Sequence, residues 1–519
     1  MIRCRKSIFL FLALFMINQI WAQQKVKSLS LEDCILRAMK DNLNVAVQVL
    51  NPELADISIS QAREKFLPSL SIDYGTRNTA SPSFSFIEAG VEVKSERNDY
   101  SVYLSQLIPA GGSFTVSLSS DRNESNQKFL TVNPRYGTIL QFNFSQPLLK
   151  DFGFKISSKD IIVAKNNRDI SENQFKRILM DTIYNVESAY WDLTFSIENL
   201  KVMRQSLKLA KDLLAKNKRE VEVGTLAPIE VLSAEAEVAT READILQAEA
   251  MVKNSEDRLK TTINIAASGE DVGVEIIPVD KPKYDKREIS LEEALVTAME
   301  NRPDLQATRV DLKNKEINLS YAKNQLLPDL SLNASYWSPG LSGTQIRYDP
   351  LDPFGDPTST IPGTSSDAMK DALKFKYKNW AVRLSLTIPL NSFIYRAQHA
   401  QAKVNLEQTV LQLKDQEQQL FLELKEAVRA VQTDYKRVQA YKLARELAEK
   451  KLEAEQKKLK VGLSTNYVVL QQQRDLSNAR SSELRAIIDY NLSLANLDKA
   501  MGTSLKNKNI RLSSISAKN

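Results

Sequence analysis

The chain has 519 residues, of which 43% are hydrophobic and 26% are charged, and its formal net charge is +6. This length implies two or three globular domains or one extended architecture. A single histidine and two cysteines argue against most metal sites and against histidine-dependent catalysis. The weak positive charge argues against nucleic-acid binding. We therefore expect a protein that is not an enzyme and has no cofactor.

Residues 1–22 have the organisation of a secretory signal peptide. A basic start is followed by an apolar run from Ile8 to Ile17, and Ala22 offers a small residue for cleavage. The run is shorter than the roughly 20 residues that an apolar helix needs to cross a membrane, and no later stretch approaches that length. We expect an exported protein, with an uncleaved anchor as the alternative, and strands in any later membrane-spanning part.

The sequence contains an internal duplication. The segment Leu29–Asp33 recurs as Ile289–Glu293, and the same spacing aligns Leu67-Pro68 with Leu327-Pro328. In both recurring segments a serine precedes an acidic residue by three positions, which is typical of a capping box at the start of a helix. Each half therefore predicts the same order of short helices, strands and a pair of long helices.

Two long helical hairpins are predicted, within about 155–266 and 392–501. Gly and Pro are absent there except near Val223-Gly224-Thr225 and at Val461-Gly462-Leu463, where each hairpin reverses, and strong helix formers dominate. Apolar residues at 3,4 spacing predict coiled-coil seams on both helices of the first hairpin. These residues are Leu200, Met203, Leu207, Ala210 and Leu214, followed by Leu232, Ala236, Ala239, Ala243, Leu246 and Ala250.

Segments of alternating polarity lie between the helices of each half. In the first half they lie near 69–76, 100–108, 113–121 and 137–146, and in the second near 329–337 and 380–388. Strands with one apolar and one polar face suit a membrane β-barrel with a wet lumen, and a soluble sandwich is the alternative.

Two connections between these strands have contrasting lengths. The Pro-rich segment 338–379 predicts a long loop on the side away from the helices, and Ile108–Gly112 predicts a tight turn on the helix side. This asymmetry is typical of outer-membrane barrels, which have long external loops and short periplasmic turns.

Together these features resemble the TolC family of outer-membrane efflux proteins over about residues 29–502. The resemblance implies a mainly α fold with a membrane β-barrel, in which long coiled-coil hairpins form a periplasmic α-barrel and the strands contribute to a β-barrel shared by a homotrimer. It implies the following division: signal peptide 1–22, first repeat 23–268, equatorial crossover linker 269–288, second repeat 289–502 and C-terminal tail 503–519.

The strand count departs from the family pattern, in which each half contributes two strands. The second half agrees, but the first half predicts four. A trimer of such chains would close a barrel with about 18 rather than about 12 strands. Alternatively, the extra hairpin packs outside or above a standard barrel.

The resemblance also implies a docking end at the hairpin turns, for a periplasmic adaptor protein. The residues concerned are Val223, Gly224, Thr225, Val461, Gly462, Leu463 and Ser464. The glycines also suit helix ends without any partner, because glycine accepts the left-handed conformation that terminates a helix.

The resemblance also implies a gate at the periplasmic entrance of the tunnel. In the family, acidic residues just past the second-repeat glycine ring the periplasmic entrance, but here those positions hold Val468 and Gln471. The corresponding first-repeat position is Glu230, which could supply one carboxylate per protomer and focus a negative potential. The alternative is that Glu230 is an ordinary first-turn acid, favoured there by the helix dipole.

The sequence therefore predicts a trimeric outer-membrane exit duct whose helical tunnel projects into the periplasm. It would complete a tripartite efflux or type I secretion system, with a periplasmic adaptor (membrane fusion) protein and an inner-membrane RND or ABC transporter, and pass small toxic compounds or polypeptides. It would contact outer-membrane lipid and no nucleic acid. The alternative is a periplasmic adaptor or structural coiled-coil protein without a pore, although adaptors usually carry one helical hairpin rather than two.

Overall fold

A computed structural model describes most of the chain, in two compact units. The described residues are 26–85, 88, 90–265, 273–351 and 355–510. The helical unit comprises residues 1–53, 170–308 and 412–519, and the strand unit comprises 54–169 and 309–411. The predicted signal peptide lies outside the described residues, as do parts of the predicted crossover linker and C-terminal tail.

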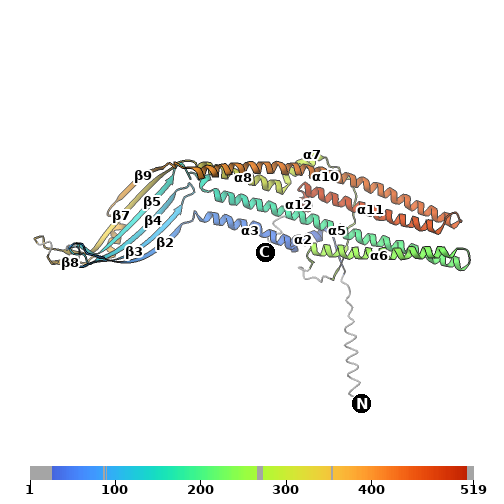
Figure 1. Cartoon of the computed structure of the whole chain (residues 1–519), viewed down its shortest axis with the longest axis horizontal. Helices are drawn as coiled ribbons and strands as arrows, with labels where there is room; N and C mark the ends of the chain where they lie inside the picture. Colours follow the sequence, from blue (N-terminus) through green and yellow to red (C-terminus); the bar gives the residue numbers. More distant parts are fainter. Residues whose placement is uncertain (1–25, 86–87, 89, 266–272, 352–354, 511–519) are drawn as a thin grey trace, which may run out of the picture. The chain divides into compact units, whose positions relative to one another are not determined.

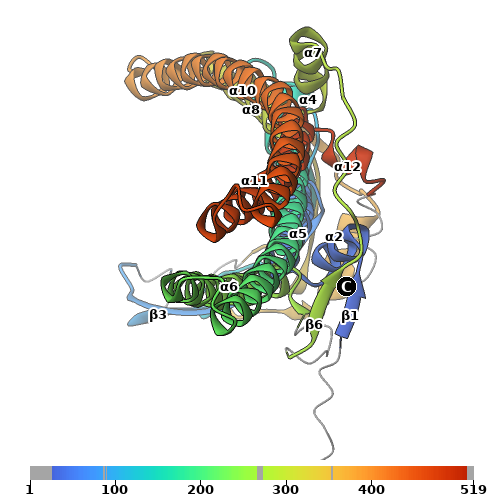
Figure 2. The ribbon, with the colours of Figure 1, turned by 90° about the vertical axis from the view of Figure 1, so that its right-hand side faces the viewer.

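Four long helices dominate the described part of the helical unit (Figure 1). They are α5 (Lys159–Glu222), α6 (Pro228–Thr262), α10 (Phe393–Lys460) and α11 (Asn466–Ala500), and the first residues of α5 and α10 belong to the strand unit. Viewed end-on they form an arc, with α6 and α10 at its two ends (Figure 2). The long helices predicted from the sequence are thus confirmed. Within the described ranges, no helix has both the length and the apolar character needed to cross a membrane.

Two short helices pack against the arc, one from each repeat. Helices α2 (Leu31–Asp41) and α7 (Leu291–Asn301) both begin with a capping box, at Ser30 and Ser290, as predicted. Helix α2 buries Cys34 and Ile35 in a core shared with α5, while α7 packs into a core with α10 and α11. Burial of such apolar side chains is what fixes the short helices on the long ones.

Part of the predicted crossover linker is a strand. β6 (Glu275–Pro278) pairs in parallel with β1 (Val26–Leu29). Tyr190 on α5 fixes this pair, because its hydroxyl accepts from the Asp280 N–H at 3.1 Å and lies within donating distance of the Asp280 carboxylate (2.9 Å) and the Leu29 carbonyl (3.2 Å). The linker is therefore attached to the first repeat by backbone as well as side-chain hydrogen bonds.

The strand unit contains one antiparallel sheet. Its long strands are β2 (Ser69–Pro82), β3 (Glu92–Leu107), β4 (Ser113–Ser125), β5 (Val132–Pro147), β7 (Asp329–Arg347) and β9 (Asn379–Thr387), hydrogen-bonded in that order. A short strand, β8 (Ser359–Ile361), pairs with the far end of β7. The remaining helices that enter this unit are α3 (Leu43–Glu64), α4 (Phe154–Ser157), α8 (Pro303–Asn324) and α9 (Ser365–Leu373).

The four strands predicted in the first half are confirmed, and the extra hairpin lies inside the sheet. β3 and β4 stand between β2 and β5 and pair with both. Within this chain the hairpin is therefore part of the sheet, while the number of strands in a trimeric barrel stays a prediction. The tight turn at Ile108–Gly112 is also confirmed, because Gly111 adopts φ +97° and the Ile108 N–H donates to the Gly112 carbonyl at 2.7 Å.

The prediction of one long loop over 338–379 is wrong. Strand β7 continues to Arg347, and the connection to β9 contains β8 and α9. The prolines concealed this, because Pro339 occupies a strand position where β7 and β5 are paired despite the missing donor.

Each face of the sheet has its own chemistry. One row runs in register across the six long strands of the described sheet and is apolar: Leu70, Leu104, Val116, Phe142, Tyr336 and Trp380. The neighbouring row, on the opposite face, is almost entirely polar: Ser69, Ser105, Thr115, Asn143, Ser335 and Ala381. The sheet thus has one face suited to lipid and one suited to water.

Candidate functional site at the helix-hairpin tips

Both hairpins reverse through the same backbone turn. Gly224 and Gly462 both adopt φ +77°, which favours glycine because other residues are strained there. The Thr225 N–H donates to the Glu220 carbonyl at 2.8 Å, and the Leu463 N–H donates to the Lys458 carbonyl at 2.9 Å. These bonds satisfy carbonyl groups that the end of each helix would otherwise leave unpaired.

The tips expose apolar side chains. Val223, Val461 and Leu463 are 73%, 69% and 77% exposed. Polar tip residues support the turns instead: the Thr225 hydroxyl donates to the Glu220 carbonyl at 2.9 Å, and the Ser464 hydroxyl donates to Glu455 at 2.6 Å. Each tip is therefore a hydrogen-bonded turn that exposes apolar side chains to solvent.

The candidate gate residues lie close behind the tips, on two different helices. Glu230 is in the first turn of α6 and half-buried, and its Oε2 atom has no hydrogen-bond partner among the described residues. On α11, Val468 is half-buried and Gln471 is exposed. Within the described part of the chain no hydrogen bond joins Glu230 to either residue, so the three do not form one cluster.

A buried ionic cluster that the sequence does not reveal joins the two hairpins behind the tips. Arg241 on α6 is 4% exposed and donates to Glu237 at 2.9 Å, to the Ser206 carbonyl at 2.7 Å and to the Leu470 carbonyl at 3.2 Å. Glu237 also accepts from Arg474 on α11. One carboxylate thus links α6 to α11, while Arg241 reaches the α5 and α11 backbones.

The electrostatics of the cluster favour the charged form of Glu237. Burial acts to raise the pKa of this carboxyl, but the hydrogen bonds from Arg474 and Arg241 outweigh it and hold the pKa below its usual range. The four long helices also share an apolar core in this part of the unit, which includes Ala210, Ala234, Leu452 and Leu476. The Arg474 side chain is 58% exposed, so the cluster is open to solvent on the α11 side. The cluster could not be recognised in the sequence, because Glu and Arg at helical spacing predict a solvated face.

The seam predicted on α6 does not form among the residues described by the structure. Leu232 and Leu246 are 61% and 69% exposed, and Ala236, Ala239, Ala243 and Ala250 are exposed as well. The face of α6 that is buried instead carries Ala234, Glu237, Val238, Arg241 and Ala248. Helix α6 therefore presents an apolar stripe that is left exposed by the residues that the structure describes.

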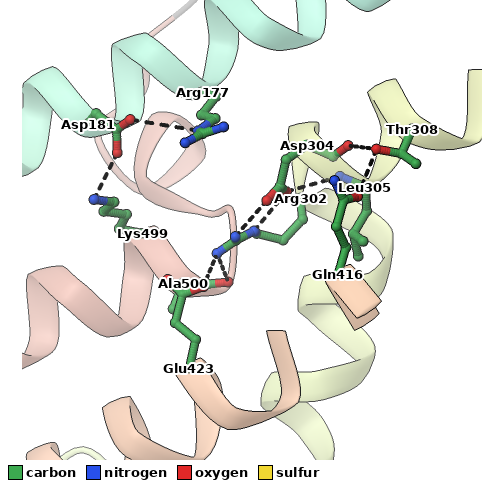
Figure 3. A network of polar contacts seen from close by, with 10 residues as sticks. All are labelled: Arg177, Asp181, Arg302, Asp304, Leu305, Thr308, Gln416, Glu423, Lys499 and Ala500. Carbon is green, nitrogen blue, oxygen red and sulfur yellow. Dashed lines mark hydrogen bonds and ion pairs between the residues drawn. The ribbon is translucent and has the colours of Figure 1, made fainter. Parts of the chain in front are cut away.

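Figure 3 shows a second polar network of the helical unit, at the end of α7. Arg302 donates to Asp304 at 2.9 and 2.7 Å, to Glu423 on α10 at 2.9 Å and to the Ala500 carbonyl at the end of α11 at 3.3 Å. Burial opposes the charge of Arg302, but the paired carboxylates raise its pKa. The Arg302 guanidinium therefore connects the end of α7 to both long helices of the second repeat, α10 and α11.

Two duplicated helical hairpins and an amphipathic antiparallel sheet define a channel protein of the TolC type. The chain belongs to the outer membrane efflux protein family, whose model matches residues 35–264 and 294–503. No curated protein is similar enough in sequence to count as a match.

Solved outer-membrane channels share this fold. The Campylobacter jejuni CmeC outer membrane channel is 16% identical, with a TM-score of 0.63, over 93% of this chain and 90% of that one. VceC from Vibrio cholerae is 14% identical, with a TM-score of 0.61, over 91% and 96%. The open state of the Neisseria gonorrhoeae MtrE channel is 19% identical, with a TM-score of 0.60, over 92% and 89%.

The family resemblance and the fold class predicted from the sequence are thus confirmed. The chain is an outer-membrane efflux channel and not an enzyme. The alternative of an adaptor or coiled-coil protein without a pore is set aside for the same reason.

Proposed function

We propose that the chain forms a homotrimeric exit duct in the outer membrane, with its helical tunnel in the periplasm, and that it completes a tripartite export assembly. The observation that carries this proposal is the pair of unpartnered edges of the helical arc. The α6 stripe defined above lies at one end, and α10 at the other end has exposed apolar residues of its own, namely Ala440, Leu443, Leu447 and Ala454.

These two edges complement each other as a head-to-tail interface. A heterologous contact that repeats around an axis closes into a ring, so that α6 of one protomer would pack on α10 of the next. The small residues on both stripes favour close helix approach. The ion pair between Glu237 on α6 and Arg474 on α11 aligns the two hairpins along their length. Leu246 on α6 then lies at about the same level along the hairpins as Leu443 on α10.

Cysteine crosslinking tests the ring directly. In a Cys34→Ala background, Leu246→Cys combined with Leu443→Cys should give dimers and trimers on oxidation. The matched control replaces Ala248, which is buried within the chain, in combination with the same α10 position. Crosslinks that form equally with both α6 positions, or no crosslinks beside an intact oligomer, would contradict the proposed interface.

The sheet supports the same assembly. Its two long edge strands, β2 and β9, expose apolar residues on the same face, including Ile72 (72%), Leu384 (64%) and Trp380 (73%). Exposed strand edges recruit further strands. If β9 of one protomer pairs with β2 of the next, three chains close a barrel of about 18 strands, which is about half again as wide as one of 12.

A deletion of the β3–β4 hairpin tests the strand number. Because β2 and β5 run antiparallel and Leu70 lies in the same row as Phe142, joining them by a short loop keeps the face pattern. We expect a trimer that still inserts into planar bilayers, with conductance reduced and larger polyethylene glycols excluded. Unchanged conductance and solute exclusion would contradict a barrel of about 18 strands.

The hairpin tips are the proposed docking surface for a periplasmic adaptor protein. Their exposed valines and leucine support this role. The energy would come from an inner-membrane RND or ABC transporter, and the exported substrate would be small toxic compounds or polypeptides. A wide barrel is compatible with either cargo.

Glu230 is the proposed gate carboxylate. Its Oε2 atom is buried and has no hydrogen-bond partner among the described residues. In a trimer, three such carboxylates would focus a negative potential around the axis. Glu230→Gln should reduce the cation selectivity of the purified channel, measured as the reversal potential under a salt gradient. Unchanged reversal potentials would show that Glu230 is not the gate carboxylate.

Outer-membrane fractionation followed by planar-bilayer conductance tests the proposal as a whole. A trimer that conducts supports the duct. A monomer, or a protein recovered from the inner membrane, would contradict it.

A further inference from the structure

The connection between β7 and β9 folds helix α9 onto the apolar face of the sheet. A Cβ atom on Gly340 would lie 1.9 Å from the backbone oxygen of Ala368, so only glycine allows the helix to approach this closely. Beyond the helix, the Phe375 ring packs on Phe142 and Tyr336 with centroid distances of 6.3 and 5.7 Å. The helix and the residues after it therefore cover the apolar face, toward the strand ends that are not joined to the long helices.

The outward side of this segment combines apolar and basic residues. Met369, Leu373 and Tyr377 are 39%, 49% and 52% exposed. Four exposed lysines alternate with them: Lys370, Lys374, Lys376 and Lys378. Such a pattern is typical of a segment that lies in a membrane surface.

Only two of these lysines are neutralised by acidic neighbours. Lys376 pairs with Asp371 at 2.7 Å, and Lys370 lies 3.7 Å from Asp367. Among the described residues, Lys374 and Lys378 have no ion-pair partner. Two uncompensated positive charges therefore lie beside the apolar row.

The surroundings of these charges suit a membrane interface. Lys378 stands two residues before Trp380, which is 73% exposed and lies opposite Tyr336 in the apolar row. Exposed aromatic rings with lysines beside an apolar band are found where hydrocarbon meets headgroups. A phosphate at that level would meet Lys374 and Lys378 while its acyl chains covered the apolar face.

We propose that the segment from Ser365 to Trp380 binds the phosphate of an anionic lipid headgroup in the outer leaflet, through Lys374 and Lys378. This inference rests on the proposed placement of the strand unit in the outer membrane. The lysines attract the phosphate, and Leu373 and Trp380 contact the lipid chains.

Native mass spectrometry of the full-length oligomer tests the site. The protein would be released from vesicles of phosphatidylcholine, with or without diphosphorylated lipid A, and the retained lipid A counted. Lys374→Gln with Lys378→Gln should weaken retention by roughly thirtyfold, because each lysine near a membrane surface contributes about a factor of five. Lys374→Arg with Lys378→Arg should retain the lipid.

The matched control is Lys94→Gln with Lys128→Gln, two exposed lysines elsewhere in the strand unit, which should leave retention unchanged. Retention that is equal in wild type and in the Lys374/Lys378 glutamine variant would overturn the site. Displacement of lipid A by inorganic phosphate alone would also overturn it, because a free ion would then suffice. A wild-type protein that fails to insert would instead contradict the proposed membrane duct.

Discussion

The two repeats make the same contact with different chemistry. In the first repeat, Asn42 follows α2 and donates through its side-chain amide to the Thr262 carbonyl, at the end of α6, at 2.8 Å. In the second, Arg302 follows α7 and donates to the Ala500 carbonyl, at the end of α11. Both residues also close the short helix, since their N–H groups donate to Ala38 and Ala298 respectively.

The difference lies in what else each side chain holds. Asn42 accepts two local hydrogen bonds, from the N–H groups of Asn44 and Val45. Arg302 instead gathers two carboxylates, one of them on the long helix α10 (Figure 3). The two repeats thus share this backbone geometry, and the second repeat has in addition an ionic connection between three elements. Equivalent positions of the two repeats therefore make equivalent backbone contacts but carry different side chains.

The largest effect is expected where only one repeat carries a buried charge. Glu237→Gln removes the carboxylate opposite Arg241 and should destabilise the protein by about 3 kcal/mol, because a buried guanidinium loses its counter-charge. Asp475, the corresponding residue past the second glycine, is exposed, and Asp475→Asn should change stability by no more than about 0.5 kcal/mol.

Chemical denaturation of the helical signal, at one protein concentration, measures both variants. If Glu237→Gln and Asp475→Asn lower the denaturation midpoint equally, the buried cluster does not make the first repeat more sensitive than the second.

A smaller difference is expected at the duplicated contact itself. Arg302→Ala leaves two half-buried carboxylates without their partner and should cost about 2 kcal/mol, whereas Asn42→Ala removes neutral hydrogen bonds and should cost about 1 kcal/mol. The same denaturation assay applies. Arg302→Asn, which imitates the first repeat, should recover part of the loss; no recovery would mean that the carbonyl contact contributes little.

Much of this architecture could be predicted from the sequence because its signals are local. Long Gly-free helices, the capping boxes at Ser30 and Ser290 and strand alternation all depend on residues close together in the chain. The Arg241 cluster and the Arg302 network could not be predicted, since each joins residues more than a hundred positions apart. Helix α9 was missed because it is short and preceded by a run of prolines. The gate and tip roles stay predictions, as they concern partners.

Acidification should weaken the ionic connections of the two repeats unequally. Burial acts to raise the pKa of Asp304, but the hydrogen bonds from Arg302 hold it below its usual value of 3.8. A carboxyl with a lowered folded-state pKa contributes stability that is complete above its unfolded pKa and lost as pH falls through the folded value.

Unfolding midpoints measured between pH 6 and pH 3 should therefore fall less steeply in Arg302→Ala than in wild type. Asn42→Ala should keep the wild-type slope. Parallel slopes in all three proteins would contradict the assignment.

The smallest effects are expected at the tips, where the repeats are most alike. Gly224→Ala and Gly462→Ala each place a Cβ at φ +77°, at a cost of about 1 kcal/mol, and neither Cβ meets an atom within 4 Å. Both substitutions should therefore lower stability equally in denaturation. If the two variants then differ in export by intact cells, the difference reflects contact with the adaptor rather than the stability of the fold. Since Leu463 adds exposed apolar surface where the first repeat has Thr225, we expect Gly462→Ala to impair export more. Equal impairment would mean that the adaptor contacts both tips alike.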